Sequence, residues 1–180
     1  MKRKLLIACL LSAAFSTQAL AWDLWDEFKS TNVTEEGRVV DYSEKNLITT
    51  SEGQSYAMFY ALVANDRKTF DQVFAWSENN LGKDQPSWLW GIPDGKMENP
   101  GKIMDTNNAT DSDMWIAYSL LEAARIWNAP EYEARANDYL AKLKELVRDI
   151  PNVGKAILPG RVGFDDKGII TMNPSYYQPR

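Results

Sequence analysis

Histidine is absent from the sequence, and the single cysteine, Cys9, lies among its first ten residues. Without histidine, a Ser-His-Asp triad and a histidine-ligated zinc site are both excluded. Cys9 falls in a segment that we expect to be removed, so the mature chain would also lack a thiol nucleophile and any disulfide. These absences direct attention to the carboxylates.

A hydrophobic run long enough to span a membrane is also lacking. Residues 2–4 are basic, Leu5 to Phe15 is mostly apolar, and residues 19–21 read Ala-Leu-Ala. This order is typical of a secretory signal peptide, so we expect cleavage after residue 21 and one domain over residues 22–180. The alternative is an N-terminal membrane anchor, but the apolar run is shorter than the roughly 20 residues that a spanning helix needs. The predicted location is the periplasm or the medium, with no membrane segment left after cleavage.

Excess positive charge is missing as well, because the formal net charge is −5 and removal of the basic leader makes it more negative. Such a chain has no electrostatic footprint for nucleic acid. Aromatic residues are abundant instead, with seven tryptophans and eight tyrosines. Partly exposed aromatic rings suit the apolar faces of sugars, although packing in the core is the alternative for each of them.

The clearest pattern along the chain is an alternation of apolar and amphipathic helices. Residues 54–64 carry no charge, which predicts burial on most sides, whereas residues 66–80 have one apolar stripe. The same alternation recurs in residues 112–127 and 131–150. It predicts two stacked helical hairpins with an inner and an outer layer. Residues 22–29 could supply one further helix.

Two longer segments are rich in loop-forming residues, and we expect both to be ordered because they carry aromatics. They are residues 82–102 and 151–180. Within residues 151–180, the sequence predicts a short hairpin over residues 164–172, with its turn near Asp166-Lys167-Gly168. Its last residues read as the approach to another helix, and two hairpins cannot close a ring. We therefore expect the chain to be a fragment of a longer protein.

Glu52 is the first candidate for chemistry, because it lies beside Gly53 directly before the uncharged helix. In one interpretation, Thr50 or Ser51 caps this helix and Glu52 only complements its dipole. In the other, the Glu52 carboxyl is partly desolvated at the opening of a buried helix. Desolvation favours the protonated form that a general acid needs.

The second candidate is the polar cluster that opens the second helix expected to be buried. Its members are Asn107, Asn108, Thr110, Asp111 and Asp113, which are more polar groups than a helix cap requires. If both inner helices begin at the same end, Glu52 and Asp111 face each other across one mouth. Two facing carboxylates are what glycoside hydrolysis needs. The Asp-x-Asp spacing could instead hold calcium, but no glycine-centred twelve-residue loop follows, so we expect no metal.

Several separated motifs together resemble glycoside hydrolase family 8. These motifs are ATDSDMWIAYSLLEAARIW (109–127), TSEGQSYAM (50–58), PSWLWG (86–91), LPGRVGF (158–164) and NPSYY (173–177). They occur in the family's order and extend the resemblance over residues 22–180. One departure is Ser112, where the family has alanine or glycine; the residue is small, so we expect it to be tolerated.

The resemblance implies an all-α fold, an (α/α)6 barrel, of which this chain would supply about the first half with long loops. It implies inverting hydrolysis of β-1,4-glucan without an obligatory cofactor. By position, Glu52 would be the proton donor, and Asp111 would be either the base or a sugar-positioning group. The implied substrate-binding residues are Tyr56, Trp88, Trp90, Asp113 and Tyr176, whereas we expect Trp115 and Trp127 to be core.

The resemblance further implies a β-1,4-glucan (cellulose) chain as the partner and a link to bacterial cellulose biosynthesis, including the cellulose synthase complex. Xylan or chitosan could replace cellulose. Family members are about twice as long, so the water-activating base is expected beyond Arg180 and these 180 residues alone are expected to be inactive. The alternative is a secreted, non-catalytic helical carbohydrate-binding or scaffold protein whose acidic residues are only caps.

Overall fold

The computed structural model of the protein describes residues 23–176. The predicted signal peptide and residues 177–180 lie outside this range. The helices are α1 (Asp23–Asn32), α2 (Ser51–Val63), α3 (Arg67–Asn80), α4 (Thr110–Trp127) and α5 (Pro130–Glu145), followed by a short 3-10 helix η1 (Pro174–Tyr176). The strands are β1 (Thr49–Thr50), β2 (Leu89–Gly91), β3 (Lys102–Asp105), β4 (Val147–Ile150), β5 (Gly154–Ile157), β6 (Asp165–Asp166) and β7 (Ile169–Ile170).

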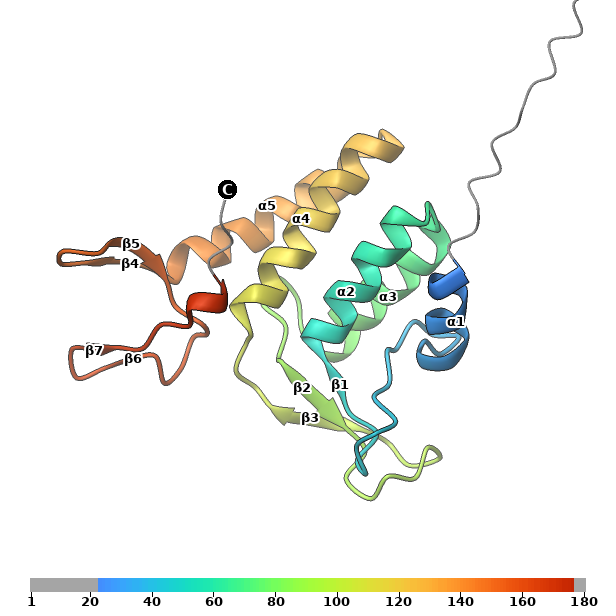
Figure 1. The fold of residues 1–180 in the computed structure, drawn as a ribbon. Helices are drawn as coiled ribbons and strands as arrows, with labels where there is room; N and C mark the ends of the chain where they lie inside the picture. Colours follow the sequence, from blue (N-terminus) through green and yellow to red (C-terminus); the bar gives the residue numbers. More distant parts are fainter. Residues whose placement is uncertain (1–22, 177–180) are drawn as a thin grey trace, which may run out of the picture.

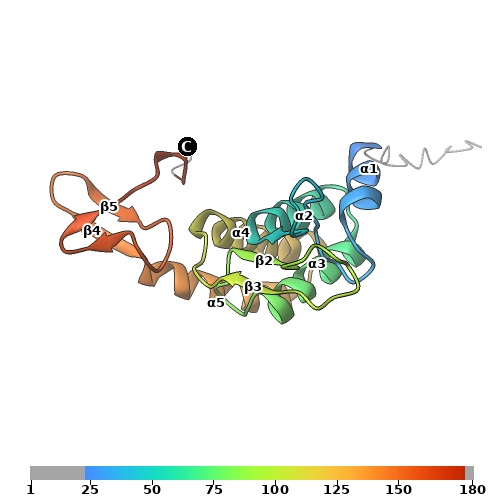
Figure 2. The same ribbon diagram turned by 90° about the horizontal axis from the view of Figure 1, so that it is seen from below.

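Helices α2 to α5 form two layers. α2 packs against α4 in one layer, and each packs against the helix that follows it, α3 or α5, in the other (Figures 1 and 2). α2 and α4 run in the same direction, so their N-termini lie at the same end of the layer. The predicted arrangement of two helical hairpins with an inner and an outer layer is therefore confirmed.

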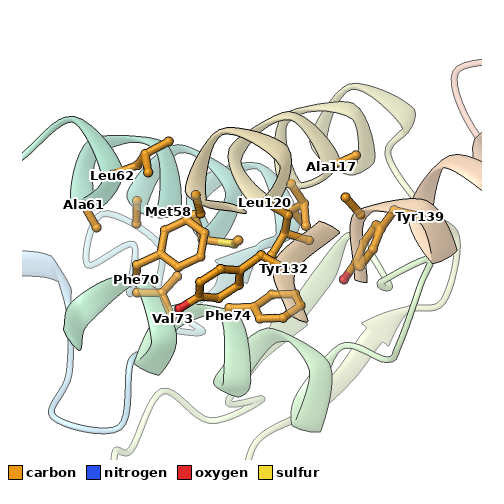
Figure 3. Packing of buried hydrophobic residues seen from close by; sticks show 14 of the residues in the cluster. Met58, Ala61, Leu62, Phe70, Val73, Phe74, Ala117, Leu120, Tyr132 and Tyr139 are labelled. Atoms are coloured by element: carbon orange, nitrogen blue, oxygen red, sulfur yellow. The ribbon is translucent and has the colours of Figure 1, made fainter. Parts of the chain in front are cut away.

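The hydrophobic core fills the space between the two layers (Figure 3). Helix α2 is mostly apolar and α3 presents a single apolar stripe to it, as the sequence patterns predict. Each large apolar side chain that is fully buried contributes about 1.5–3 kcal/mol. Members from all four helices are Met58, Ala61, Phe70, Phe74, Leu120 and Tyr139.

A small antiparallel sheet lies across the end of the molecule where α2 and α4 begin (Figure 1). Its order is β1-β2-β3, and Thr49 pairs with Trp90. Residues 82–102, which we expected to be an ordered loop, supply β2 and lead into β3. Because β1 runs directly into α2, this sheet helps to set where α2 begins.

The predicted helix over residues 131–150 is wrong at its C-terminal end. Helix α5 ends at Glu145, and residues 147–150 form β4, which pairs with β5. Leu146 and Ile150 continue the helical spacing, which concealed the change. Val147 and Ile150 are β-branched and therefore also suit a β-strand. They lie in the β4–β5 hairpin, whose turn contains Asn152 with a φ of 65°.

The other short elements follow the predictions more closely. The hairpin expected over residues 164–172 is confirmed as β6 and β7, with Lys167 and Gly168 at positive φ in its turn. Helix α1 extends to Asn32, three residues beyond the expected end. Within residues 23–176, no helix has both the length and the apolar character needed to cross a bilayer.

Asp66 holds α1 against the start of α3. Its side chain caps α3 by accepting a hydrogen bond from the Thr69 backbone N–H at 3.1 Å, and it accepts another from Lys29 Nζ at 2.8 Å. Burial acts to raise the pKa of Asp66, but the hydrogen bonds from Lys29 and Thr69 outweigh it and lower this pKa to about 2. The ionised form is therefore the one that stabilises the fold.

We expect Asp66→Asn to lower the free energy of unfolding by about 1–2 kcal/mol at pH 7. The folded pKa lies below the unfolded value, so this contribution is complete above pH 4 and is lost as the pH falls towards 2. Urea unfolding at several pH values measures it. Asp26→Asn is the control, because Asp26 is 56% exposed and 3.7 Å from the same Lys29. Equal losses for both variants would contradict the role of Asp66.

Candidate active site

A pocket of about 730 Å³ opens where α2 and α4 begin. Its volume lies within the roughly 300–1,000 Å³ typical of ligand sites. The lining residues come from α2, α4 and the segment ending in η1; they are Glu52, Tyr56, Phe59, Asp111, Met114, Trp115, Tyr118, Ser175 and Tyr176. Two carboxylates thus lie among five aromatic rings.

The two carboxylates occupy equivalent places on neighbouring helices. Glu52 is the second residue of α2 and Asp111 is the second residue of α4. Because the two helices begin at the same end, both side chains reach the same pocket. Burial raises the pKa of Asp111, and the negative charge of Glu52 across the pocket raises it further. The structure therefore brings together the acidic pair that the sequence suggested.

Neither carboxylate is a helix cap. Thr50 caps α2 by accepting a hydrogen bond from the Gly53 backbone N–H at 3.0 Å, and α4 has no side-chain cap at Ala109. Asp111 accepts a hydrogen bond from the adjacent Ser112 N–H at 2.9 Å. Glu52 is exposed, so the partial desolvation proposed in the second interpretation is not found.

A tyrosine hydroxyl contacts each carboxylate. Tyr56 donates a hydrogen bond to Glu52 Oε1 at 3.0 Å, and the Tyr176 hydroxyl hydrogen-bonds to Asp111. Burial, together with the hydrogen bond to Glu52, raises the pKa of Tyr56 to about 12. Burial also raises the pKa of Asp111, while the hydrogen bonds from Ser112 and Tyr176 oppose that rise. Both tyrosines remain donors at neutral pH.

The backbone of Trp88 connects the starts of the two inner helices. The Ser51 N–H donates to the Trp88 carbonyl at 3.0 Å, and the Trp88 N–H donates to the Asn107 carbonyl at 2.7 Å. The Trp88 indole also hydrogen-bonds to Asp105. Trp88 does not line the pocket, so its contact with substrate stays a prediction, whereas its bridging of the two helices is observed.

Trp90 is half-buried among neighbouring side chains. The Arg38 guanidinium lies over its ring at 4.2 Å, and Trp76 meets it edge-on with ring centroids 5.4 Å apart. On another side, a Cβ atom added at Gly101 would come within 1.9 Å of the indole. The ring also lies outside the pocket lining. The predicted substrate contact of Trp90 therefore stays a prediction, and the observed role of the ring is its packing against these neighbours.

Asp113 and Trp115 also differ from expectation. Asp113 is 1% exposed and lies outside the pocket lining, which does not fit its predicted contact with substrate. Trp115, expected in the core, is half-buried and lines the pocket beside Tyr56 and Phe59. Trp127 packs against the core as expected.

The sequence reasoning missed Phe59, Met114 and Tyr118, and a simple pattern would have revealed two of them. In α2, an aromatic residue follows Glu52 at the fourth and seventh positions, as Tyr56 and Phe59. In α4, Trp115 and Tyr118 follow Asp111 at the same spacings. Positions i, i+4 and i+7 share one helix face, so each helix presents a carboxylate followed by two rings.

These features place the chain among proteins built from helical hairpins with acidic residues at one end of the inner layer. The family described as Glycosyl hydrolases family 8 matches residues 1–180. The chain belongs to this family, whose structures are (α/α)6 barrels, and its two hairpins correspond to part of such a ring.

Among curated proteins, the chain is 44% identical to an endoglucanase of Escherichia coli (strain K12) over 182 residues, which cover 97% of this chain and 48% of that protein. Among solved structures, it resembles an endo-1,4-D-glucanase from Vibrio fischeri ES114 with 44% identity and a TM-score of 0.78. That match covers 86% of this chain and 46% of the other. The endo-β-1,4-glucanase CMCax from Acetobacter xylinum gives 31% identity, a TM-score of 0.75 and coverage of 86% and 48%. The chain thus spans about half the length of these relatives.

Because the Tyr176 hydrogen bond lowers the pKa of Asp111, Tyr176→Phe should raise that pKa further. Carboxyl carbon NMR of Asp111 during a pH titration measures the change. Tyr118→Phe is the matched control, since it removes a hydroxyl from the same pocket and we expect it to leave the titration midpoint of Asp111 in place. An unchanged midpoint in Tyr176→Phe would show that this hydrogen bond does not stabilise the carboxylate.

We expect Trp90→Ala to lower the free energy of unfolding by roughly 3 kcal/mol, because the variant leaves a cavity between Arg38, Trp76 and Gly101. Trp115→Ala should cost less stability, since this ring already faces the pocket. Thermal and urea unfolding of the two variants makes the comparison. If Trp90→Ala kept wild-type stability while sugar binding fell, the original interpretation of Trp90 would be restored.

Proposed function

We propose that the protein carrying this chain is an endo-β-1,4-glucanase that hydrolyses cellulose-type glucan with inversion at the anomeric carbon. The observation that carries the proposal is the placement of Glu52 and Asp111. They open two parallel inner helices at one end and share one aromatic pocket. The names of the E. coli and Vibrio fischeri relatives support the choice of glucan.

Glu52 is the proposed general acid. It transfers its proton to the glycosidic oxygen as the bond between that oxygen and C1 breaks, and the shortened glucan leaves as an alcohol. The negative charge then left on Glu52 is stabilised by the hydrogen bond from Tyr56. The place of Glu52 in the first turn of α2 adds the favourable field of the helix N-terminus.

Asp111 is the proposed partner that holds the sugar at the cleavage site. As a carboxylate, it accepts a hydrogen bond from a ring hydroxyl and stabilises the positive charge that develops at C1 in the transition state. Its contacts with Ser112 and Tyr176 keep it in place. Water adds to C1 from the opposite face and gives its proton to a base, and the proposal assigns that base to a residue outside these 180.

The aromatic rings are the proposed platform for the glucan chain. Phe59, Trp115 and Tyr118 line the pocket beyond the two carboxylates. Flat rings pack against the apolar faces of successive sugar units, and this mode of binding suits cleavage within a chain. Xylan and chitosan present similar ring faces, so they are the competing substrates in any assay.

The proposed location is the periplasm or the medium, because residues 1–21 have the order of a secretory signal peptide. There the enzyme would meet newly made glucan and would trim it beside the cellulose synthase complex. The excess of acidic residues in the chain is consistent with a neutral polysaccharide as the partner.

Glu52→Gln in the full-length protein tests the acid. Hydrolysis of cellohexaose should fall by about 10²–10⁴-fold, whereas a cellobioside with a dinitrophenolate leaving group, which needs no proton, should still be cleaved. Reducing-sugar release and dinitrophenolate absorbance report the two reactions, and calorimetry should show that cellohexaose binding is retained. Equal losses on both substrates would remove Glu52 from the role of acid.

A non-catalytic carbohydrate-binding protein is the second candidate, favoured by the aromatic rings that line the pocket. The 180-residue chain should bind cellohexaose through the pocket but should not degrade carboxymethylcellulose. Trp115→Ala should weaken that binding, and Trp76→Ala, which alters a ring outside the pocket, is the control. Robust hydrolysis by the 180 residues would overturn the assignment of the base to another part of the protein.

A further inference from the structure

A buried pair of polar side chains lies at the start of α4, outside the pocket lining. Asn108 is 3% exposed and precedes the helix, whereas Asp113 is 1% exposed and belongs to its first turns. Asn108 Nδ2 donates a hydrogen bond to Asp113 Oδ2 at 2.7 Å. At its other end, Asn108 Oδ1 accepts a hydrogen bond from the Arg161 backbone N–H at 2.7 Å. Asn108 therefore connects the helix to a loop 53 residues away along the chain.

This loop, residues 159–162, is held tightly against the start of α4. The Thr110 N–H donates to the Pro159 carbonyl at 2.9 Å. Asn107 exchanges two hydrogen bonds with the backbone of Val162, at 3.0 and 3.2 Å. A Cβ atom added at Gly160 would lie 2.7 Å from the Asn108 carbonyl oxygen, so no larger residue fits there without movement.

The same loop carries the chain towards Tyr176. From Val162 the chain passes through the β6–β7 hairpin, which the hydrogen bond from the Thr171 N–H to the Phe164 carbonyl closes at 2.9 Å, and then reaches η1. Tyr176 returns to the pocket and hydrogen-bonds to Asp111. Asp111 is thus fixed by α4 on one side and by the end of this loop on the other, and Asn108 joins the two.

We propose that Asn108 and Asp113 form a positioning pair for Asp111, which locks the first turn of α4 to the loop that delivers Tyr176 to the Asp111 carboxylate. Neither side chain lines the pocket, so the pair acts through the backbone and through Tyr176. This inference refines the proposed glucanase site, but its geometry stands whatever substrate the pocket takes.

The charges around Asp113 suit such a role. Burial is the main reason that the pKa of Asp113 is raised to about 7, and the negative charge of Asp111 raises it as well. The hydrogen bond from Asn108 and the positive charge of Arg161 both act to lower this pKa. The Tyr139 hydroxyl on α5 is also close enough to interact electrostatically with Asp113. Below pH 7 the neutral Asp113 therefore adds no second negative charge beside Asp111.

An exchange of the two side chains tests the pair. At pH 8, above the pKa of about 7 for Asp113, Asn108→Asp removes the donor and places two carboxylates in contact. The double variant N108D/D113N restores one donor and one acceptor with their positions reversed. In N108D/D113N the side chain at position 108 can still accept the hydrogen bond from the Arg161 backbone N–H. Asp113→Asn alone keeps an acceptor for Asn108, so we expect it to behave like the wild type below pH 7.

The readout is fluorine NMR of 3-fluorotyrosine placed at position 176, recorded well below each melting temperature. We expect Asn108→Asp to move the resonance towards that of solvent-exposed fluorotyrosine, and we expect the double variant to return it. Glu122→Gln, farther along α4 and exposed at its ion pair with Arg125, is the control and should change nothing. Where Asn108→Asp does not fold, Asn108→Ala replaces it.

Two results would overturn the proposal. One is a wild-type resonance for Tyr176 in folded Asn108→Asp or Asn108→Ala. The other is a double variant that regains thermal stability while its resonance stays displaced, since that outcome would make the pair structural only. The fluorine signal needs no turnover. A wild type that fails to hydrolyse glucan would therefore count against the proposed function alone.

Discussion

The parallel direction of α2 and α4, secured by the backbone of Trp88, is the constraint on which the site depends. Trp88 accepts a hydrogen bond from Ser51 and donates one to Asn107, so a single peptide segment sets where both inner helices begin. Glu52 and Asp111 each follow these starting points by only one to four residues. If the sequence of either helix were shifted by one residue relative to this starting point, its carboxylate would be rotated by about 100° around the helix axis and would point away from the pocket.

The pocket chemistry follows from one spacing used twice. A carboxylate and two aromatic rings at positions i, i+4 and i+7 lie on one face of each helix, and two such faces side by side form a wall of acids and rings. The acids lie at the N-terminal ends, where the helix dipole favours their charge. The rings lie farther along, where they serve as an apolar platform. Polar and apolar functions of the pocket are thus separated along the helix axes.

Much of this arrangement could be predicted from the sequence, because α2 and α4 carry fewer charged residues than the amphipathic helices α3 and α5 that follow them. The pairing of Glu52 with Asp111 followed from the starts of those helices. What could not be predicted depends on contacts between distant residues. Trp90 packs against Arg38 and Gly101, and Asp113 is buried beside Asn108, although local sequence made both look available. The end of α5 was missed because Ile150 fits a helix and a strand equally well.

The most direct test of the central claim is a crystal structure of the Glu52→Gln variant of the full-length protein with cellohexaose. The account predicts a glycosidic oxygen within about 2.6–3.2 Å of the side chain at position 52. It also predicts that Asp111 contacts a hydroxyl of the adjoining sugar, and that Trp115 or Tyr118 stacks on a neighbouring ring. A glucan bound away from this pocket, with neither carboxylate in contact, would contradict the account.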